Sequence, residues 1–154
     1  MRWHSVVDYD FNNGNGIGVS LWVCGCPHKC KGCHNPQLFD PNQGHMGHLS
    51  ALDKIYKALD DPNIDKHLSI LGGEPLAPYN VKGVLEIVKA ISEKYPKKQI
   101  WLWTGYEWDE LNEEQMEVFK YVDYMVVGRF IEELKVRNEW FGSSNQKIII
   151  NLER

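Results

Sequence analysis

Predicted strands and helices alternate along this chain, and that alternation limits its possible folds more than any other feature of the sequence. Runs rich in branched and aromatic residues predict strands, and apolar residues at helical spacing predict helices. Such alternation is typical of βαβ units, in which a helix connects two parallel strands. The predicted strands are 17–24, 67–71, 99–103, 124–127 and 147–152, and the predicted helices are 49–59, a segment beginning after Asn80, and 113–121.

The length of 154 residues limits how such a sheet can close. A complete eight-fold β/α barrel takes about 250 residues. We therefore expect an α/β fold with a partial, open barrel of mostly parallel strands, in a single domain over residues 1–154. Folds of this kind bind their ligands at the C-terminal ends of the strands. Functional groups are expected just after the predicted strands.

Composition and charge argue against several classes of protein. The chain has 17 Lys and Arg against 21 Asp and Glu, so its formal net charge of −4 provides no general basic field for nucleic acid. No apolar run approaches the roughly 20 residues of a membrane-spanning helix. The first residues lack the basic and then apolar layout of a signal peptide. We expect a cytoplasmic protein that binds neither nucleic acid nor a membrane.

All four cysteines, Cys24, Cys26, Cys30 and Cys33, lie within ten residues at the end of a predicted strand. A disulfide framework would connect distant parts of a small secreted fold, so a metal site or redox cluster in a reducing compartment is the better interpretation. The last three form a Cys-x-x-x-Cys-x-x-Cys run whose thiolates can bind one compact cluster. A [4Fe–4S] cube has four irons, so three cysteines leave one iron open for a small molecule.

Two alternatives stay open for this loop. The three cysteines could bind zinc, with His28 or His34 as the fourth ligand. Cys24 could serve as a fourth cluster ligand. Because it lies in the predicted strand only two residues before Cys26, we interpret it instead as a small packed residue.

A second motif, Gly72-Gly73-Glu74-Pro75, follows the strand at 67–71. Two glycines allow the backbone to approach a ligand closely, and their carbonyl groups can accept hydrogen bonds from an ammonium group. The alternative is a simple turn that ends the strand, with Glu74 in solvent.

These motifs carry a resemblance to a known family. The segments Val23–Asn35, Gly72–Leu76, Ile100–Tyr106 and Gly142–Gln146 resemble the radical S-adenosylmethionine superfamily and, within it, the activating enzymes of anaerobic (class III) ribonucleotide reductase. They follow the same order as in that family and cover nearly the whole chain. The resemblance implies a partial, open (β/α) barrel of radical SAM type.

The resemblance also implies a set of site residues. Cys26, Cys30 and Cys33 would hold a [4Fe–4S] cluster, and S-adenosylmethionine would chelate its open iron through the methionine amino and carboxylate groups. Many superfamily members carry an aromatic residue where Gly32 stands, so the adenine contact would come from backbone around Gly32–His34. The residues expected at the cofactor are Gly32, Cys33, His34, Gly72, Gly73, Glu74, Thr104, Asn145 and Gln146.

The implied activity is reductive cleavage of S-adenosylmethionine. The 5′-deoxyadenosyl radical would then generate a glycyl radical on the large subunit of anaerobic ribonucleotide reductase, with a flavodoxin-type protein as reductant. No catalytic side chain is expected beyond the cluster and S-adenosylmethionine. The alternatives are another glycyl-radical protein or a small molecule as substrate, or a zinc-binding adaptor without catalysis.

Aromatic residues in loops are candidates for the face that docks the partner. We expect Trp108, Trp140 and Phe141 to belong to such loops, whereas Trp101 and Trp103 alternate in a predicted strand and should pack.

Overall fold

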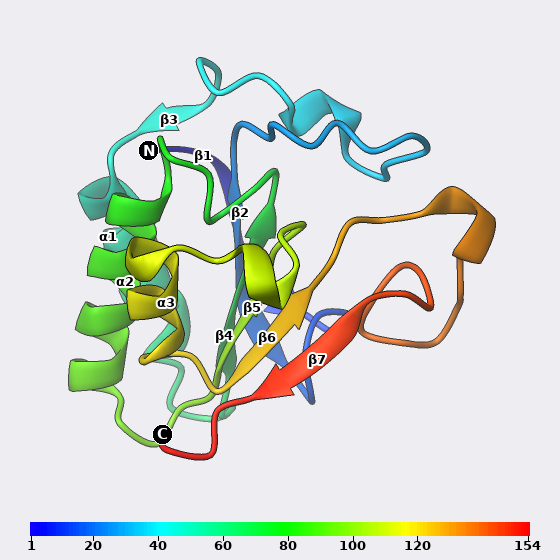
Figure 1. Ribbon diagram of the computed structural model, residues 1–154. Coiled ribbons are helices and arrows are strands. Elements are labelled where there is room, and N and C mark those ends of the chain that lie inside the picture. Colours follow the sequence, from blue (N-terminus) through cyan, green and yellow to red (C-terminus); the bar gives the residue numbers. More distant parts are fainter.

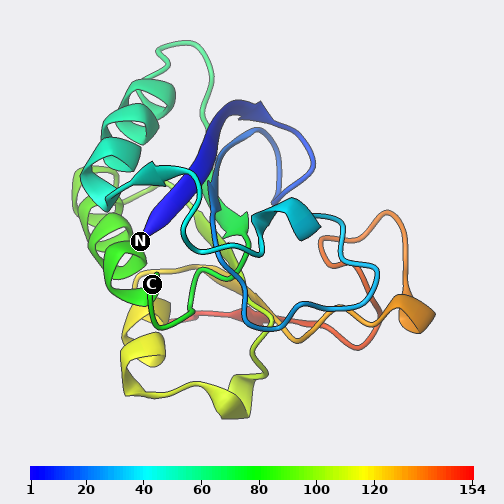
Figure 2. The same cartoon turned by 90° about the horizontal axis from the view of Figure 1, so that it is seen from above.

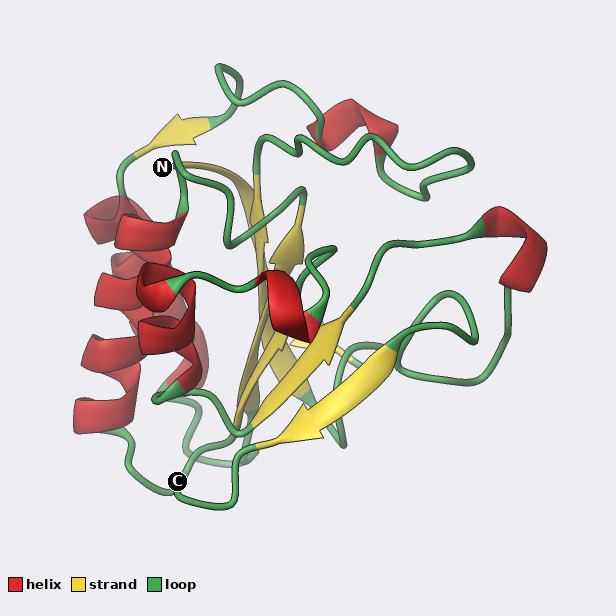
Figure 3. Cartoon of the chain, in the orientation of Figure 1, coloured by secondary structure: helices red, strands yellow, loops and turns green.

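A computed structural model describes residues 1–154 as one seven-stranded sheet with three α-helices against one of its faces (Figures 1 and 3). The strands lie in the order β3-β1-β2-β4-β5-β6-β7, so the sheet is open and β3 and β7 form its edges. The strands are β1 (Arg2–Asp10), β2 (Gly18–Val23), β3 (His45–Met46), β4 (His67–Gly72), β5 (Ile100–Trp103), β6 (Tyr124–Val127) and β7 (Lys147–Ile150). The helices are α1 (His48–Leu59), α2 (Val81–Lys94) and α3 (Glu113–Phe119), with 3₁₀ turns at Pro36–Leu38, Trp108–Glu110 and Glu132–Leu134.

The four central strands are parallel. β2 pairs with β4, β4 with β5, and β5 with β6, all in parallel register. The outer pairings, β3 with β1, β1 with β2 and β7 with β6, are antiparallel. The expected α/β class and the parallel central strands are confirmed, while the last predicted strand is shorter than expected and runs antiparallel to its neighbour.

The first strand was not predicted from the sequence. β1 carries a mixed polar pattern, and only Trp3 and Asp10 along it are buried. A strand with so few buried residues has little apolar periodicity, which is the signal that predicts strands. The predicted helices are confirmed, with their ends displaced by one or two residues.

The core lies between the sheet and α1 and α2. Along β2, the apolar residues Val19, Leu21 and Val23 are fully buried in this core, as are Leu68 and Ile70 of β4. Both helices have one apolar face, because their buried residues recur three or four positions apart. Burial of these faces is the main favourable contribution to folding. The helical residues in the core are Ala51, Leu52, Ile55, Ala58, Leu59, Val81, Val84, Ile87, Val88, Ile91 and Val118.

The opposite face of the sheet carries an aromatic cluster. Trp101 of β5 is almost fully buried and stacks on Tyr124 of β6 at 4.2 Å between ring centroids. Trp103 stacks on Trp101 at 5.7 Å, so the predicted packing of both tryptophans is confirmed. Trp140 meets Trp101 edge-on at 4.8 Å and stays 39% exposed, so it both packs on the sheet and presents an aromatic edge to solvent.

The long loops extend from the sheet on the side away from the helices. Seen from above, the segments around residues 24–44 and 128–146 lie on that side (Figure 2). These loops follow the C-terminal ends of β2 and β6. None of the helices combines the length and the apolar character needed to cross a membrane.

The core makes a direct prediction about stability. Ile70→Ala removes a fully buried side chain from the middle of β4 and should lower the free energy of unfolding by about 2–5 kcal/mol. Urea denaturation of the metal-free protein measures this change. Leu152→Ala is the control, because Leu152 is 89% exposed and its truncation should change stability by less than about 0.5 kcal/mol. Equal effects of the two substitutions would contradict the described core.

Candidate functional site

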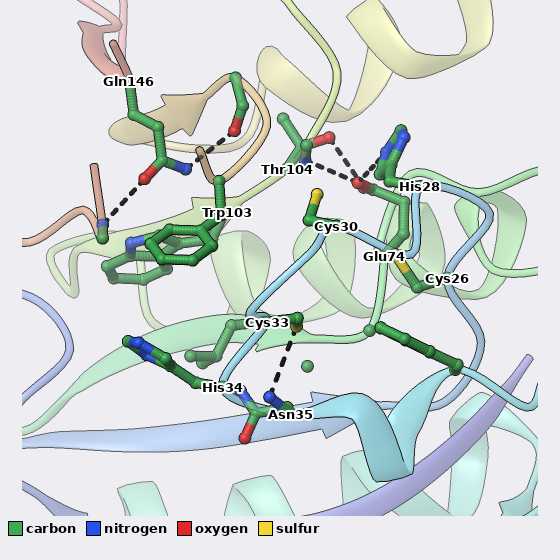
Figure 4. Close-up of a pocket in the computed structure, with 18 residues that line it drawn as sticks. Cys26, His28, Cys30, Cys33, His34, Asn35, Glu74, Trp103, Thr104 and Gln146 are labelled. Atoms are coloured by element: carbon green, nitrogen blue, oxygen red, sulfur yellow. Dashed lines mark hydrogen bonds and ion pairs between the residues drawn. The ribbon is translucent and has the colours of Figure 1, made fainter. Parts of the chain in front are cut away.

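A cavity lies where the parallel strands β2, β4, β5 and β6 end (Figure 4). Each strand end contributes a segment to its wall, as expected for an α/β fold. The lining residues are Cys26, His28, Cys30, Cys33, His34, Asn35, Phe39, Leu71, Gly72, Gly73, Glu74, Trp103, Thr104, Gly105, Gly128, Phe130, Gly142 and Gln146. Most of the residues expected at the cofactor are therefore brought together here.

The three cysteines of the Cys-x-x-x-Cys-x-x-Cys run all line this cavity, and none forms a disulfide. Cys24 is fully buried outside the cavity, so its interpretation as a packed residue is confirmed. The loop turns sharply at Gly32, whose φ is 74°. A Cβ at that position would lie 2.7 Å from the carboxyl carbon of Glu132. The positive φ therefore favours glycine at position 32, whereas the exposed Glu132 side chain could move aside for a larger residue.

The donor set fits a [4Fe–4S] cluster. No group of three His, Cys, Asp or Glu side chains is arranged to hold a single metal ion, and the three cysteines are distributed around one cavity. A cube-shaped cluster takes one thiolate at each of three separate corners, so it can use sulfur atoms that do not converge on one point. Three thiols with the fourth cysteine buried elsewhere match a cluster that keeps one iron open.

Burial controls the protonation of the groups around the cysteine loop. Desolvation raises the pKa of the Cys26 thiol, although the backbone N–H groups of Lys29 and His28 act in the opposite direction. Desolvation also raises the pKa of Tyr79 to about 12 and raises that of Tyr106, with the nearby acidic groups adding to both shifts. The phenol groups beside the loop are therefore neutral at ordinary pH, and iron must displace a proton from Cys26 to bind.

Glu74 is a buried carboxylate with four hydrogen bonds. Its Oε1 accepts from the Leu76 N–H at 2.9 Å and from the Thr104 hydroxyl at 2.7 Å. Its Oε2 accepts from the Gly105 N–H at 2.7 Å and pairs with His28 Nε2 at 2.8 Å (Figure 4). The side chain is only 1% exposed, so the alternative of a solvated acid in a simple turn is wrong.

The glycines before Glu74 let two strand ends approach each other. A Cβ on Gly72 would lie 2.4 Å from the Val23 carbonyl oxygen, and one on Gly73 would lie 2.4 Å from that of Gly25. The Gly73 and Glu74 N–H groups donate to these same two carbonyl oxygens. Any larger residue would push the end of β4 away from the start of the cysteine loop.

Thr104 and His34 lie at different parts of the cavity. The Thr104 hydroxyl donates to Glu74 and accepts from the Tyr106 N–H at 3.2 Å, so its side chain is used in internal contacts. His34 lies in the exposed part of the wall and packs against Phe130 with 5.3 Å between ring centroids. Together with Trp103, these rings form an aromatic end of the cavity.

The Gly-Ser-Ser-Asn-Gln segment joins two loops through its side chains. Gln146 Oε1 accepts from the Gly142 and Ser143 N–H groups, and its Nε2 donates to the Gly128 carbonyl oxygen at 2.8 Å. Asn145 Nδ2 donates to the Arg129 carbonyl oxygen at 2.8 Å. Gln146 lines the cavity whereas Asn145 does not, so Asn145 supports the wall from behind.

Sequence reasoning missed several lining residues. It considered His28 only as a zinc ligand and did not connect it with Glu74. It also missed Gly105, Gly128 and Phe130, which lie just after the ends of β5 and β6. Their positions directly after predicted strands were the available signal.

Comparison with known proteins agrees with this geometry. A family model described as "4Fe-4S single cluster domain" matches residues 12–149. The anaerobic ribonucleoside-triphosphate reductase-activating proteins of Vibrio cholerae and Escherichia coli K12 are 40% and 39% identical to this chain over 150 residues. Each match covers 96% of this chain and 97% of the relative. The protein of that name from bacteriophage T4 is 33% identical over 153 residues, covering 99% of this chain and 96% of the relative.

This chain belongs to the family of anaerobic ribonucleoside-triphosphate reductase-activating proteins. The resemblance seen in the sequence is therefore confirmed. The match to a 4Fe-4S domain supports an iron–sulfur cluster rather than the alternative of a zinc site.

The role of Gln146 in the wall can be tested. Gln146→Ala leaves the Gly142 and Ser143 N–H groups without their acceptor and should lower the free energy of unfolding by about 1–3 kcal/mol. Urea denaturation of the metal-free protein measures the change. Ser144→Ala is the matched control in the same loop, because Ser144 is exposed and should change stability by less than about 0.5 kcal/mol. A Gln146→Ala variant with the same free energy of unfolding as the wild type would show that the loop does not depend on the Gln146 amide.

Proposed function

We propose that this chain is the activating enzyme of an anaerobic ribonucleoside-triphosphate reductase and that it acts through a [4Fe–4S] cluster and S-adenosylmethionine. The observation that carries the proposal is the set of three cysteine thiols around one cavity at the strand ends. Three thiolates leave one iron of the cube free to bind a small chelating molecule. The names of the relatives supply the reductase as the protein substrate.

When bound and supplied with one electron, the cluster and S-adenosylmethionine would provide reductive cleavage of the sulfonium and, through it, removal of a hydrogen atom from a glycine Cα of the large reductase subunit. Within this chain, the thiolates of Cys26, Cys30 and Cys33 hold the irons. No side chain in the cavity needs to act as an acid, a base or a nucleophile. The electron comes from a separate reductant of flavodoxin type in the cytoplasm.

The end of β4 orients the methionine part of S-adenosylmethionine. The Glu74 carboxylate is fully used in internal hydrogen bonds, so it is the backbone of Gly72 and Gly73 that offers acceptors to the ammonium group. Glu74 would therefore support the strand ends from within the protein, whereas the sequence led us to expect that it contacts the cofactor. Thr104 supports the same carboxylate.

The opposite end of the cavity receives the adenosine. Cys33 and His34 line it, while Gly32 lies just outside the lining, and Trp103 and Phe130 give it apolar walls. Gln146 shapes the wall through its contacts with backbone groups, and Asn145 supports it from behind. Once a ligand fills the cavity, these apolar walls would keep water away from the reacting atoms.

The open sheet is a partial radical SAM barrel within a single domain over residues 1–154. The two free edges, β3 and β7, support this interpretation, because a closed barrel would have none. An open side allows a loop of another protein to approach the cavity. Trp108, at the start of the 3₁₀ turn Trp108–Glu110, and Trp140 are both partly exposed and are candidates for contact with such a protein.

The first experiment tests cleavage of S-adenosylmethionine. The protein is reconstituted anaerobically with iron and sulfide, reduced, and incubated with S-adenosylmethionine, and 5′-deoxyadenosine is quantified by chromatography. We expect product from the wild type and a loss of at least about 100-fold in Cys30→Ala, because that variant lacks one of the three proposed ligands. Cys24→Ala is the matched control and should keep most of the activity, since Cys24 is buried outside the cavity. Zinc bound stoichiometrically with no iron cluster would overturn the proposal.

The second experiment tests the protein substrate. The reduced, loaded enzyme is mixed with S-adenosylmethionine and the large reductase subunit, and electron paramagnetic resonance detects an organic radical. A doublet that collapses when the reductase glycine is deuterated at Cα identifies the glycyl radical. Formation of 5′-deoxyadenosine without any radical on the reductase would mean that the substrate is a different molecule.

A further inference from the structure

The middle of the cysteine loop has few attachments to the rest of the protein. Over residues 27–32, the only hydrogen bond between two backbone groups is accepted by the Cys30 carbonyl oxygen from the Cys33 N–H, within the loop itself. The ion pair between Lys31 and Glu132 spans 4.0 Å, and the Lys31 side chain is 84% exposed, so it adds little rigidity. The loop therefore depends on side-chain contacts to hold its shape.

His28 provides such a contact. It lies between Cys26 and Cys30, and its side chain is 6% exposed. Its Nε2 lies 2.8 Å from Glu74 Oε2, and its ring meets Tyr106 edge-on with 4.6 Å between centroids. A Cβ on Gly105 would lie 2.4 Å from the ring, so glycine at that position makes room for the imidazole.

The hydrogen-bond partners of Glu74 determine the direction of this contact. Both carboxylate oxygens already accept from N–H or O–H donors of Leu76, Thr104 and Gly105. A buried carboxylate is stable only when its oxygens are hydrogen-bonded, and a fourth donor completes two bonds on each oxygen. Because a carboxylate can only accept, His28 is the donor, and its imidazole ring carries a proton on Nε2.

We propose that His28 is a positioning residue for the cluster. Through Glu74, it ties the segment between Cys26 and Cys30 to the ends of β4 and β5, so that the metal-free protein already holds the cysteine loop near the Gly72–Gly73 backbone. The inference rests on the proposed function. It adds to that function a contact that aligns the cysteine loop with the Gly72–Gly73 backbone. A ligand loop that is ordered before binding loses less conformational entropy when the cluster assembles.

Trypsin cleavage can report whether the cysteine loop is ordered. Lys29 and Lys31 are exposed, so trypsin can cleave after either residue when the loop loosens. In the metal-free, reduced protein, His28→Leu should be cleaved at these sites about tenfold faster than the wild type, the factor that one hydrogen bond to a charged group supplies. His28→Gln should remain within about twofold of the wild type, because its amide nitrogen can still donate to Glu74. His4→Leu, an exposed position on β1, is the matched control and should leave the rate unchanged.

A second measurement applies even if His28→Leu does not fold. In wild-type metal-free protein, nuclear magnetic resonance should show two imidazole Nε2 protons protected from exchange, one of His28 and one of the buried His67, whose Nε2 lies 2.7 Å from the Asn13 carbonyl oxygen. The His28 signal should be absent from His28→Gln, while the His67 signal remains. The proposal is overturned if no protected imidazole proton belongs to His28. It is also overturned if His28→Leu folds and resists trypsin like the wild type, or if His28→Gln loosens the loop as much as His28→Leu.

These outcomes are separable from those of the proposed function. Fast cleavage of His28→Leu, together with a wild type that assembles a cluster and makes no 5′-deoxyadenosine, would support the positioning role and overturn the activity. Normal 5′-deoxyadenosine formation by a His28→Leu variant whose loop resists trypsin like the wild type would support the proposed activity and overturn the positioning role of His28. In the loaded protein, chelator-driven loss of the cluster should be about tenfold faster in His28→Leu than in His28→Gln.

Discussion

The parallel pairing of β2, β4, β5 and β6 is the constraint on which the rest of the structure depends. Parallel strands end at the same edge of a sheet, so segments that are separated by many residues in the sequence meet around one cavity. The helices that connect these strands bury their apolar faces against the sheet and fix the strand order. The cysteine loop, the glycine pair and the C-terminal loop become neighbours as a result.

Around this cavity, polar side chains and backbone groups contribute in different ways. The polar side chains of Glu74, Thr104, Asn145 and Gln146 bond mainly to groups of the protein itself. They fix the wall, while the cysteine sulfurs and backbone groups face the interior. Under the proposed function, a small domain would bind a large cofactor pair with few side-chain ligands, because the polar side chains keep the backbone in a fixed shape.

Much of the fold could be predicted from the sequence because the central strands and the helices are buried on at least one face. β1 could not, since only two of its nine residues are buried and its polar and apolar residues do not alternate, and the direction of β7 depends on pairing with β6, which periodicity does not encode. The three cysteines were recognisable from their spacing. The bond between His28 and Glu74 was not, because it joins residues 46 positions apart through the fold. The same is true of the internal role of Gln146.

Cys24 is sealed in the interior, while the other three thiols border a cavity that solvent can enter. After loss of a cluster, oxidants therefore meet only Cys26, Cys30 and Cys33. Disulfides formed there would cross-link residues of one short loop and would not reach the packed interior. Damage by oxygen then remains local, and a thiol reductant can return the chain to a form that accepts iron and sulfide again.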